Sequence, residues 1–188
     1  IPSRLVGSEM CIRDRPKGRS GRREVARMSF SIDAVAEFED FVEDMYDFAD
    51  EQALSVDTLI HENGAAQLEI NFNHGDPLDM ADQVFVFKRT VRETAQRHNM
   101  YATFMAKPMQ KEPGSALHIH QSILSLATGD NIFNSADDQP TPELMHYIAG
   151  LQRYTPDLIS FYAPNVNSYR RLAPVSYTHL TLPTMRTV

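Results

Sequence analysis

The chain has 188 residues, enough for one domain with a sizeable core, and its composition is typical of a globular protein. Its formal net charge of -7 argues against a general nucleic-acid binder, which would present a basic face. No apolar run approaches the roughly 20 residues of a membrane helix, and no apolar stretch typical of a secretory signal follows the basic N-terminus. Cys11 is the only cysteine, so an intramolecular disulfide is excluded and a cytoplasmic location is expected.

Both ends of the chain resemble peptides produced when sequencing-adapter DNA is translated onto an assembled gene fragment. Residues 1–15 show no clear period, and residues 176–188 lack turn or cap patterns. Two ordinary disordered tails are the alternative interpretation. Under either interpretation we expect both tails to lie outside a folded unit of residues 16–175.

The first half of this unit is predicted to contain a β-hairpin between two helices. Residues 16–31 are rich in arginine, glycine and serine, which predicts a loop. The first helix is predicted to begin near Asp33, and its apolar face repeats at helical spacing through Val35, Phe38, Val42, Met45 and Ala49. Residues 55–62 and 67–73 are predicted strands joined by a short turn. A second long helix is expected from about Asp79 to His98.

The second half is predicted to begin with strands at 101–106 and 116–124. Residues 141–143 carry a cap followed by proline, which predicts a helix. The side chains expected to point inward from it are Leu144, Met145, Ile148 and Leu151. A shorter helix is predicted from 155 until Pro164, and 165–174 is predicted to be extended or a loop. The elements predict an α+β domain with a curved antiparallel or mixed sheet and helices packed outside it.

Two carboxylates flank the predicted turn of the hairpin. Glu62 and Glu69 are seven residues apart, and across a turn both can return to one face of the strand pair. Small residues at 64–66 allow a tight turn or the close approach of a ligand. Two surface carboxylates would show the same spacing, but the apolar surroundings favour a paired or metal-bound state. His61 is expected on the opposite strand face, in a core hydrogen bond.

Polar side chains also alternate along the predicted strand 116–124. Period two places His118, His120 and Ser122 on one face. Imidazole is a good ligand for Mn²⁺ and Zn²⁺, and a pair of hydrogen-bonded histidines is the alternative. Further along, Arg170 and Arg171 could clamp a carboxylate or phosphate bidentately, although surface arginines would look the same.

Four motifs, taken together and in this order, resemble the catalytic domain of the glutamine synthetase family. They are His-Glu-x-Gly-x-x-Gln-x-Glu-Ile at 61–70, Lys-Pro at 107–108, Gly-Ser-x-x-His-x-His-Gln-Ser at 114–122 and Asn-Ser-Tyr-x-Arg-Leu-x-Pro at 167–174. The similarity extends over about 16–175. Residues 57–124 are more similar to the γ-glutamylpolyamine (γ-glutamylputrescine) synthetase branch than to ammonia-using glutamine synthetases.

The resemblance implies an ATP-dependent carboxylate–amine ligase. ATP would phosphorylate the γ-carboxylate of glutamate, and an amine such as putrescine would attack the γ-glutamyl phosphate. Two Mg²⁺ or Mn²⁺ ions per site are implied, because negative charge builds on the transferring phosphoryl group and on both carboxylates. A double-ring homo-oligomer with sites between subunits is implied as well. Glutamine synthesis from ammonia, a metal-dependent hydrolase and a non-catalytic structural relative are the alternatives.

The motifs also imply roles for single residues. Glu62 and Glu69 match two ligands of one metal ion, and His118 matches a ligand of the other. His120 and Ser122 match nucleotide-binding positions.

Two further positions match the part of the family site that binds glutamate. Gly114 matches the loop that faces glutamate, and Arg171 matches the arginine that holds a glutamate carboxylate, which makes it the predicted catalytic residue. Pro113 departs from the asparagine of many family members, so that side-chain contact is absent. The family's Glu-x-Glu strand and β-grasp domain would precede this chain, and its Arg-x-Glu-x-Arg motif would follow. We therefore expect 16–175 to be a partial catalytic domain, inactive alone, from an active parent protein.

Overall fold

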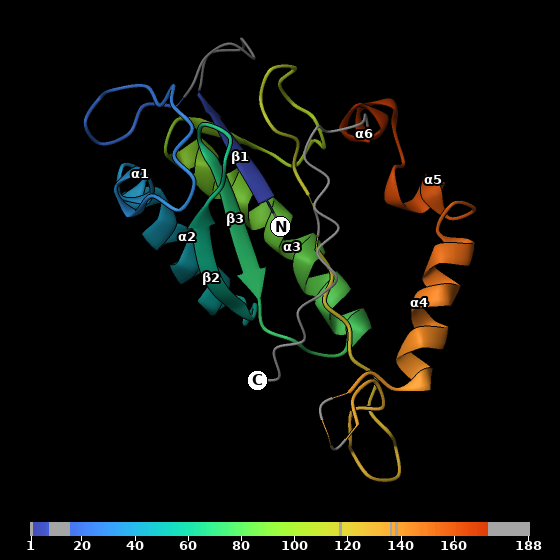
Figure 1. Ribbon diagram of the computed structural model, residues 1–188. Coiled ribbons are helices and arrows are strands. Elements are labelled where there is room, and N and C mark those ends of the chain that lie inside the picture. The colour runs from blue at the N-terminus through green and yellow to red at the C-terminus, as the bar shows by residue number, and fades with distance from the viewer. Residues whose placement is uncertain (1, 8–15, 117, 136, 138, 173–188) are drawn as a thin grey trace.

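The computed structural model describes residues 2–7, 16–116, 118–135, 137 and 139–172. In this part of the chain the strands form one antiparallel sheet in the order β2-β3-β1-β4 (Figure 1). Their bounds are β1 (Pro2–Gly7), β2 (Val56–His61), β3 (Gln67–Phe72) and β4 (Met100–Thr103). The predicted α+β class is confirmed, and the sheet is antiparallel rather than mixed.

The position of β1 differs from the expectation that residues 1–15 lie outside the fold. Pro2–Gly7 lies between β3 and β4, with Pro2 opposite Glu69 and Arg4 opposite Thr103. Ladder hydrogen bonds join backbone groups, so a segment can complete a sheet without any side-chain period that sequence reasoning could detect. The adapter origin of this peptide stays a prediction, and residues 176–188 lie outside the described residues.

The first predicted helix is divided into α1 (Ile32–Ala36) and α2 (Glu39–Glu51). Ser31, not Asp33, caps α1, because its side chain accepts a hydrogen bond from the Ala34 N–H. The helix stops at Glu37, whose carbonyl accepts from the Arg19 N–H at 2.8 Å while its carboxylate accepts from Ser20. A loop from earlier in the sequence therefore occupies the Glu37 carbonyl, which would otherwise accept from the next turn of the helix.

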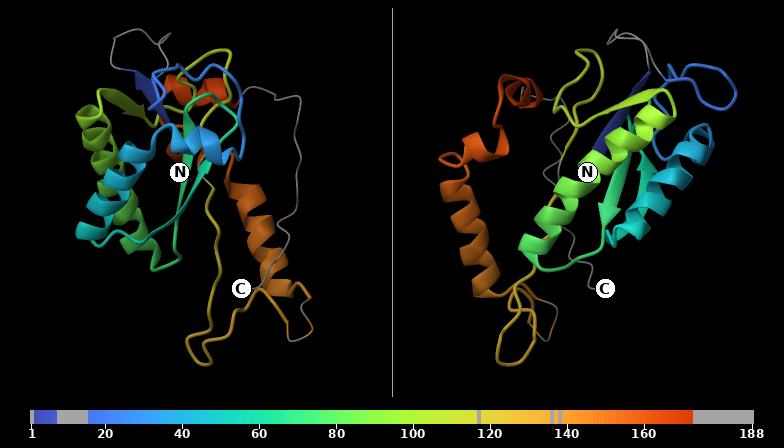
Figure 2. Two further views of the ribbon diagram at one scale, coloured as in Figure 1. Left: turned by 90° about the vertical axis from the view of Figure 1, so that its left-hand side faces the viewer. Right: turned by 180° about the vertical axis from the view of Figure 1, so that it is seen from behind.

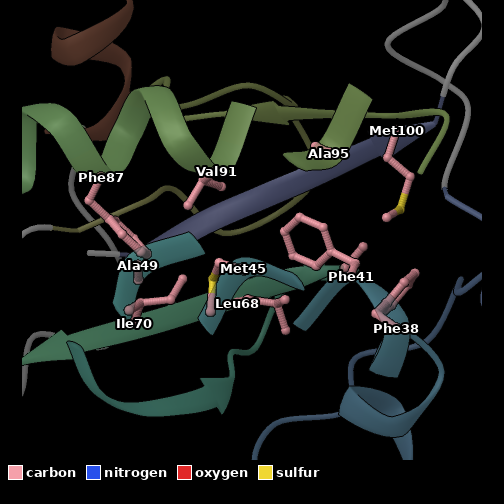
Figure 3. Packing of buried hydrophobic residues seen from close by; sticks show 11 residues of the cluster. Phe38, Phe41, Met45, Ala49, Leu68, Ile70, Phe87, Val91, Ala95 and Met100 are labelled. Atoms are coloured by element: carbon pink, nitrogen blue, oxygen red, sulfur yellow. The ribbon is translucent and has the colours of Figure 1, made fainter. Parts of the chain in front are cut away.

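The hydrophobic core lies between one face of the sheet and the pair α2 and α3 (Pro77–Arg97), which both cover that face (Figure 2). Side chains from β3, α2 and α3 meet there (Figure 3), and Phe72 meets Phe87 edge-on at 5.1 Å between ring centroids. The buried members are Phe38, Phe41, Met45, Ala49, Ala66, Leu68, Ile70, Phe87, Val91, Ala95 and Met100. The predicted apolar face of the first helix is thus the packed one.

The C-terminal helices form an arm that stands away from this core (Figures 1 and 2). They are α4 (Pro142–Tyr154), α5 (Ile159–Tyr162) and α6 (Val166–Arg171). The predicted start of α4 is confirmed, since Thr141 caps it. The prediction that its apolar side chains point inward is wrong, because Met145 is 56% and Leu151 43% exposed and no residue of α4 is buried.

The last part of the arm also corrects the prediction of a loop at 165–174. Asn165 caps α6 by accepting from the Ser168 N–H at 3.0 Å, so a cap pattern follows Pro164. None of the helices in the described ranges is long and apolar enough to span a lipid bilayer.

Replacement of Phe87 by alanine is expected to lower the free energy of unfolding by about 3–5 kcal/mol, because the ring is fully buried. Phe85 lies two positions earlier on the same helix and is 78% exposed, so Phe85→Ala should change it by less than about 0.5 kcal/mol. Urea unfolding followed by far-UV circular dichroism measures both. Equal losses in the two variants would contradict the packing of α3 on the sheet.

Candidate functional site

The β2–β3 hairpin places Glu62 and Glu69 on the face of the sheet that α2 and α3 leave open. Ile60 lies opposite Glu69, and His61 lies opposite Leu68. Leu68 is buried in the core, so the alternation of side chains turns Glu69 to the other face. Glu62 lies two residues beyond Ile60 and therefore shares that face. The predicted common face of the two carboxylates is present.

The electrostatics of Glu62 reflect this pairing. Burial raises the pKa of its carboxyl, the Asn63 N–H lowers it, and the hydrogen bond and charge of Glu69 raise it further. His118 lowers it, which places the imidazole within electrostatic reach of the pair. The net result is a pKa above the usual 4.5. Two carboxylates that face each other are stabilised by a proton or a cation between them, so this pair is a candidate site for a metal ion.

The donor set of the described residues fits part of a metal centre. Carboxylate oxygens are the ligands that Mg²⁺ and Mn²⁺ prefer, and Glu62 and Glu69 supply two such groups. Among the described residues, however, no three side chains of His, Cys, Asp or Glu come together as a complete centre. The roles of Glu62, Glu69 and His118 as metal ligands therefore stay predictions.

The predicted strand at 116–124 is not present in the described part of that segment. Residues 118–123 have no assigned strand, and His118, His120 and Ser122 are all exposed. A strand requires a neighbouring backbone to pair with, and the structure provides one only at the end of the segment. There Leu124 forms an isolated antiparallel β-bridge with Asn131. The Ile132 N–H donates to the Ile123 carbonyl beside it. The nucleotide-binding roles of His120 and Ser122 stay predictions.

The predicted substrate positions Gly114 and Arg171 are brought together. Arg171 Nη1 donates to the Ser115 carbonyl at 3.0 Å, and its Nη2 donates to the Tyr162 carbonyl at 3.5 Å. Ser115 is itself anchored, because its N–H donates to Ala106 at 2.8 Å and its hydroxyl to Met105 at 3.0 Å. The guanidinium thus lies against a loop whose backbone is held in place.

Gly114 is packed so closely that a side chain would not fit. An added Cβ would lie 2.8 Å from the Ala106 carbonyl oxygen and 3.1 Å from Arg171 Cγ. On the other side of this cluster, Asn167 holds α6 to the Lys107 backbone with two hydrogen bonds. Its Oδ1 accepts from the Lys107 N–H at 2.8 Å, and its Nδ2 donates to the Lys107 carbonyl at 2.9 Å. Two of the four motifs, at 107–108 and 167–174, therefore meet in space.

Glu24 holds the hairpin turn from behind, which sequence reasoning missed. Its carboxylate accepts from the Ala66 N–H at 2.7 Å and pairs with His61 Nε2 at 3.0 Å. His61 is buried, as expected, and its Nδ1 lies 2.7 Å from the Glu62 carbonyl. Ala66 has a φ of 53°, an uncommon conformation for a residue with a side chain. No local signal links Glu24 to a turn about forty residues away.

Gln67 is a second residue that was missed as part of the site. It is buried, its Oε1 accepts from the Gly64 N–H at 3.1 Å, and its Nε2 donates to the Gly114 carbonyl at 3.3 Å. A signal for it exists, because β3 alternates polar and apolar side chains. Gln67 has the same parity as Glu69, so it belongs to the site face rather than the core face.

A hollow of about 410 Å³ lies elsewhere, on α4 and α5, between residues such as Tyr147, Tyr154 and Tyr162. None of the predicted site residues lines it. The hairpin face and the Gly114–Arg171 cluster therefore remain the candidate site.

Comparison with known proteins identifies the family of the chain. The glutamine synthetase catalytic-domain family matches residues 6–182. The chain belongs to this family. The chain is 36% identical over 156 residues to gamma-glutamylputrescine synthetase of Escherichia coli, covering 82% of the chain and 33% of the relative. It is 34% identical over 145 residues to glutamine synthetase of Pyrococcus horikoshii, covering 77% of the chain and 32% of that relative.

Solved structures of the family have the same fold. The structure of apo GmaS without ligand has a TM-score of 0.79 at 26% identity, over 92% of this chain and 40% of that one. A complex of GmaS with ADP has a TM-score of 0.78, also at 26% identity, over 92% of this chain and 39% of that one. The chain spans about a third of the length of the curated relatives that it matches. The family and the fold are thus shown by sequence and by structure.

Replacement of Glu24 by glutamine is expected to destabilise the protein mainly at acidic pH. Burial lowers the pKa of His61, but the hydrogen bonds and charges of Glu24 and Glu62 together outweigh it, Glu24 contributing most, and raise the pKa above the usual 6.5. A raised pKa adds stability that is complete below pH 6.5 and is lost as the pH rises through the folded value. In Glu24→Gln we expect the free energy of unfolding to fall by about 1–3 kcal/mol below pH 6.5. The loss should shrink at alkaline pH, where a neutral His61 imidazole can accept a hydrogen bond from the new amide.

Urea midpoints at a series of pH values measure this difference. Glu39→Gln is the matched control, because Glu39 pairs with Arg19 at an exposed site and should cost less than about 0.5 kcal/mol at any pH. A Glu24→Gln effect that is independent of pH would contradict the ion pair with His61.

Proposed function

We propose that the full-length protein containing this chain is an ATP-dependent ligase that joins the γ-carboxylate of glutamate to an amine. A polyamine such as putrescine is the proposed amine. The similarity to gamma-glutamylputrescine synthetase supports this choice, and the glutamine synthetase relatives make ammonia the second candidate. Because the chain covers about a third of these relatives, the activity belongs to the full-length protein.

The observation that carries the proposal is the carboxylate pair Glu62 and Glu69 on the open sheet face, with His118 in electrostatic reach. The Gly114–Arg171 cluster is linked to the turn of the same hairpin through Gln67. A site for a phosphorylated carboxylate needs cations where charge develops and a fixed guanidinium for the substrate. The described residues offer both kinds of group.

In the proposed reaction a γ-carboxylate oxygen of glutamate attacks the terminal phosphorus of ATP, and ADP leaves. The amine nitrogen then attacks the γ-carbonyl carbon, loses a proton and expels phosphate. Mg²⁺ or Mn²⁺, held by Glu62 and Glu69 with His118 at a second ion, would supply charge neutralisation at the phosphoryl group. Arg171 would hold a glutamate carboxylate, and Gly114 would let the substrate approach the backbone closely.

The remaining roles are proposed from the family resemblance. His120 and Ser122 would contact ATP, and the GmaS–ADP complex shows that a relative of this fold binds an adenine nucleotide. We also propose a cytoplasmic homo-oligomer, a double ring, in which neighbouring subunits complete each site.

Release of phosphate from ATP by the full-length protein is expected to depend on glutamate and on an amine. Parallel assays with putrescine, longer amines and ammonia should give the highest kcat/KM with putrescine. Highest kcat/KM with ammonia would replace polyamine glutamylation by glutamine synthesis. Absence of amine-dependent release with every amine would reject the ligase.

Glu69→Ala tests the proposed metal site in the same assay. It should lower kcat by at least about 10²-fold, as expected for removal of a group that stabilises transition-state charge. Glu93→Ala, at an exposed position of α3, should leave the rate unchanged. Near-normal activity of Glu69→Ala with Mn²⁺ would refute the assignment of Glu69.

Gly114→Ala is expected to raise the KM for glutamate by about 10-fold to 10²-fold, because the new Cβ must displace either the Ala106 carbonyl or Arg171. Gly150→Ala is the matched control, since nothing lies within 4 Å of a Cβ at that position. Steady-state kinetics with glutamate as the varied substrate measures both. An unchanged KM in Gly114→Ala would show that this loop does not face glutamate.

A further inference from the structure

We propose that Gln67 is a positioning residue that couples cation binding at the Glu62–Glu69 hairpin to glutamate binding at the Gly114–Arg171 cluster. This inference rests on the proposed function and extends it, because it assigns a role to a residue that would touch neither the substrate nor the metal.

Gln67 holds the hairpin turn with its backbone and its side chain. Its N–H donates to the Gly64 carbonyl at 3.0 Å, and its carbonyl accepts from the Glu62 N–H at 2.7 Å. Its side-chain Oε1 accepts from the Gly64 N–H at 3.1 Å. The backbone position of Glu62, and through it the direction of the carboxylate, therefore depends on where Gln67 lies.

The other end of the same amide reaches the second half of the site. Nε2 donates to the Gly114 carbonyl at 3.3 Å, 47 residues along the chain. The carbonyl of the next residue, Ser115, accepts a hydrogen bond from the Arg171 guanidinium at 3.0 Å. Hydrogen bonds joined by the Gly114–Ser115 backbone thus run from the turn beside Glu62 to the arginine proposed to hold glutamate.

The chemistry of this position requires an amide. Gly64 presents a donor and Gly114 presents an acceptor, and the glutamine side chain satisfies both at once while only 2% exposed. A carboxylate could serve Gly64 but could not donate to Gly114, and a thioether of the same length could do neither. Because one amide holds both segments, movement of the Gly114 loop on glutamate binding would be transmitted to the turn. Cation binding at the turn would affect the loop in the same way, since coupling between two binding sites is reciprocal.

The test measures Mn²⁺ binding to the full-length protein by electron paramagnetic resonance, with and without saturating L-glutamate. In the wild-type protein glutamate should tighten Mn²⁺ binding by roughly 5- to 150-fold, the usual range of coupling between sites. In Gln67→Met this factor should fall to about one. The KM for glutamate should rise by about 10-fold while the KM for ATP stays unchanged, since the two bonds that methionine loses, to Gly64 and Gly114, do not reach the proposed ATP positions His120 and Ser122.

Gln83→Met is the matched control, because the Gln83 amide also accepts from a backbone N–H and donates to an oxygen, at the other end of the sheet. Its Oε1 accepts from the Ser55 N–H at 2.7 Å, and its Nε2 donates to Asp79 at 2.7 Å. This variant should keep the full coupling factor. Gln67→Glu is the second variant if Gln67→Met does not fold. It keeps the bond to Gly64 and loses the donor to Gly114. Its coupling factor is the ratio of its Mn²⁺ affinities with and without glutamate, so a change in its Mn²⁺ affinity alone does not count.

Three results with the variants would overturn the inference while leaving the ligase intact. They are an unchanged coupling factor in the Gln67 variants, an equal loss in Gln83→Met, and a parallel rise of both KM values. A wild-type protein that turns over with an amine but shows no effect of glutamate on Mn²⁺ binding also overturns it. If the wild type neither binds Mn²⁺ nor shows amine-dependent phosphate release, the proposed function fails and the inference fails with it.

Discussion

One-sided burial of the sheet is the constraint on which the rest of this structure depends. The pair α2 and α3 covers one face, and Leu68 and Ile70 of β3 fill the core beneath it. Because successive side chains of a strand point to opposite faces, Gln67 and Glu69 must lie on the other side. A register slip by one residue would move Glu69 into the apolar core, where an unpaired carboxylate is costly. The packing of the core thus also determines the face on which the carboxylates lie.

The turn of the hairpin depends on polar groups that come from outside the hairpin. Glu24 accepts from Ala66 and pairs with His61, while Gln67 links the turn to the Gly114 loop. Each of these groups is buried or nearly so, and a buried polar group without a partner costs about 1–3 kcal/mol. The precise shape of the turn, including the positive φ of Ala66, is therefore maintained by loops that are distant in sequence.

The two halves of the candidate site differ in how far they were predictable. The common face of Glu62 and Glu69 follows from strand periodicity and one turn, so it could be predicted. The proximity of Gly114 to Arg171 came only from the family resemblance. The strand expected at 116–124 was wrong in its described part, because alternation indicates a strand only where another strand is present to pair with it. The apolar face of α4 was likewise expected to be buried and is exposed, because helical spacing of apolar residues leads to burial only where another element packs against that face.

The class of the fold, the hairpin, most of the two long helices and the motifs of the family could all be predicted from the sequence. These features depend on local propensity and on side-chain period, which a linear sequence carries. The place of β1 in the sheet, the break at Glu37 and the contacts of Glu24 and Gln67 behind the site were found only in the folded chain. Each of these depends on hydrogen bonds between segments far apart in the chain, and a backbone or amide partner leaves no periodic pattern in the sequence.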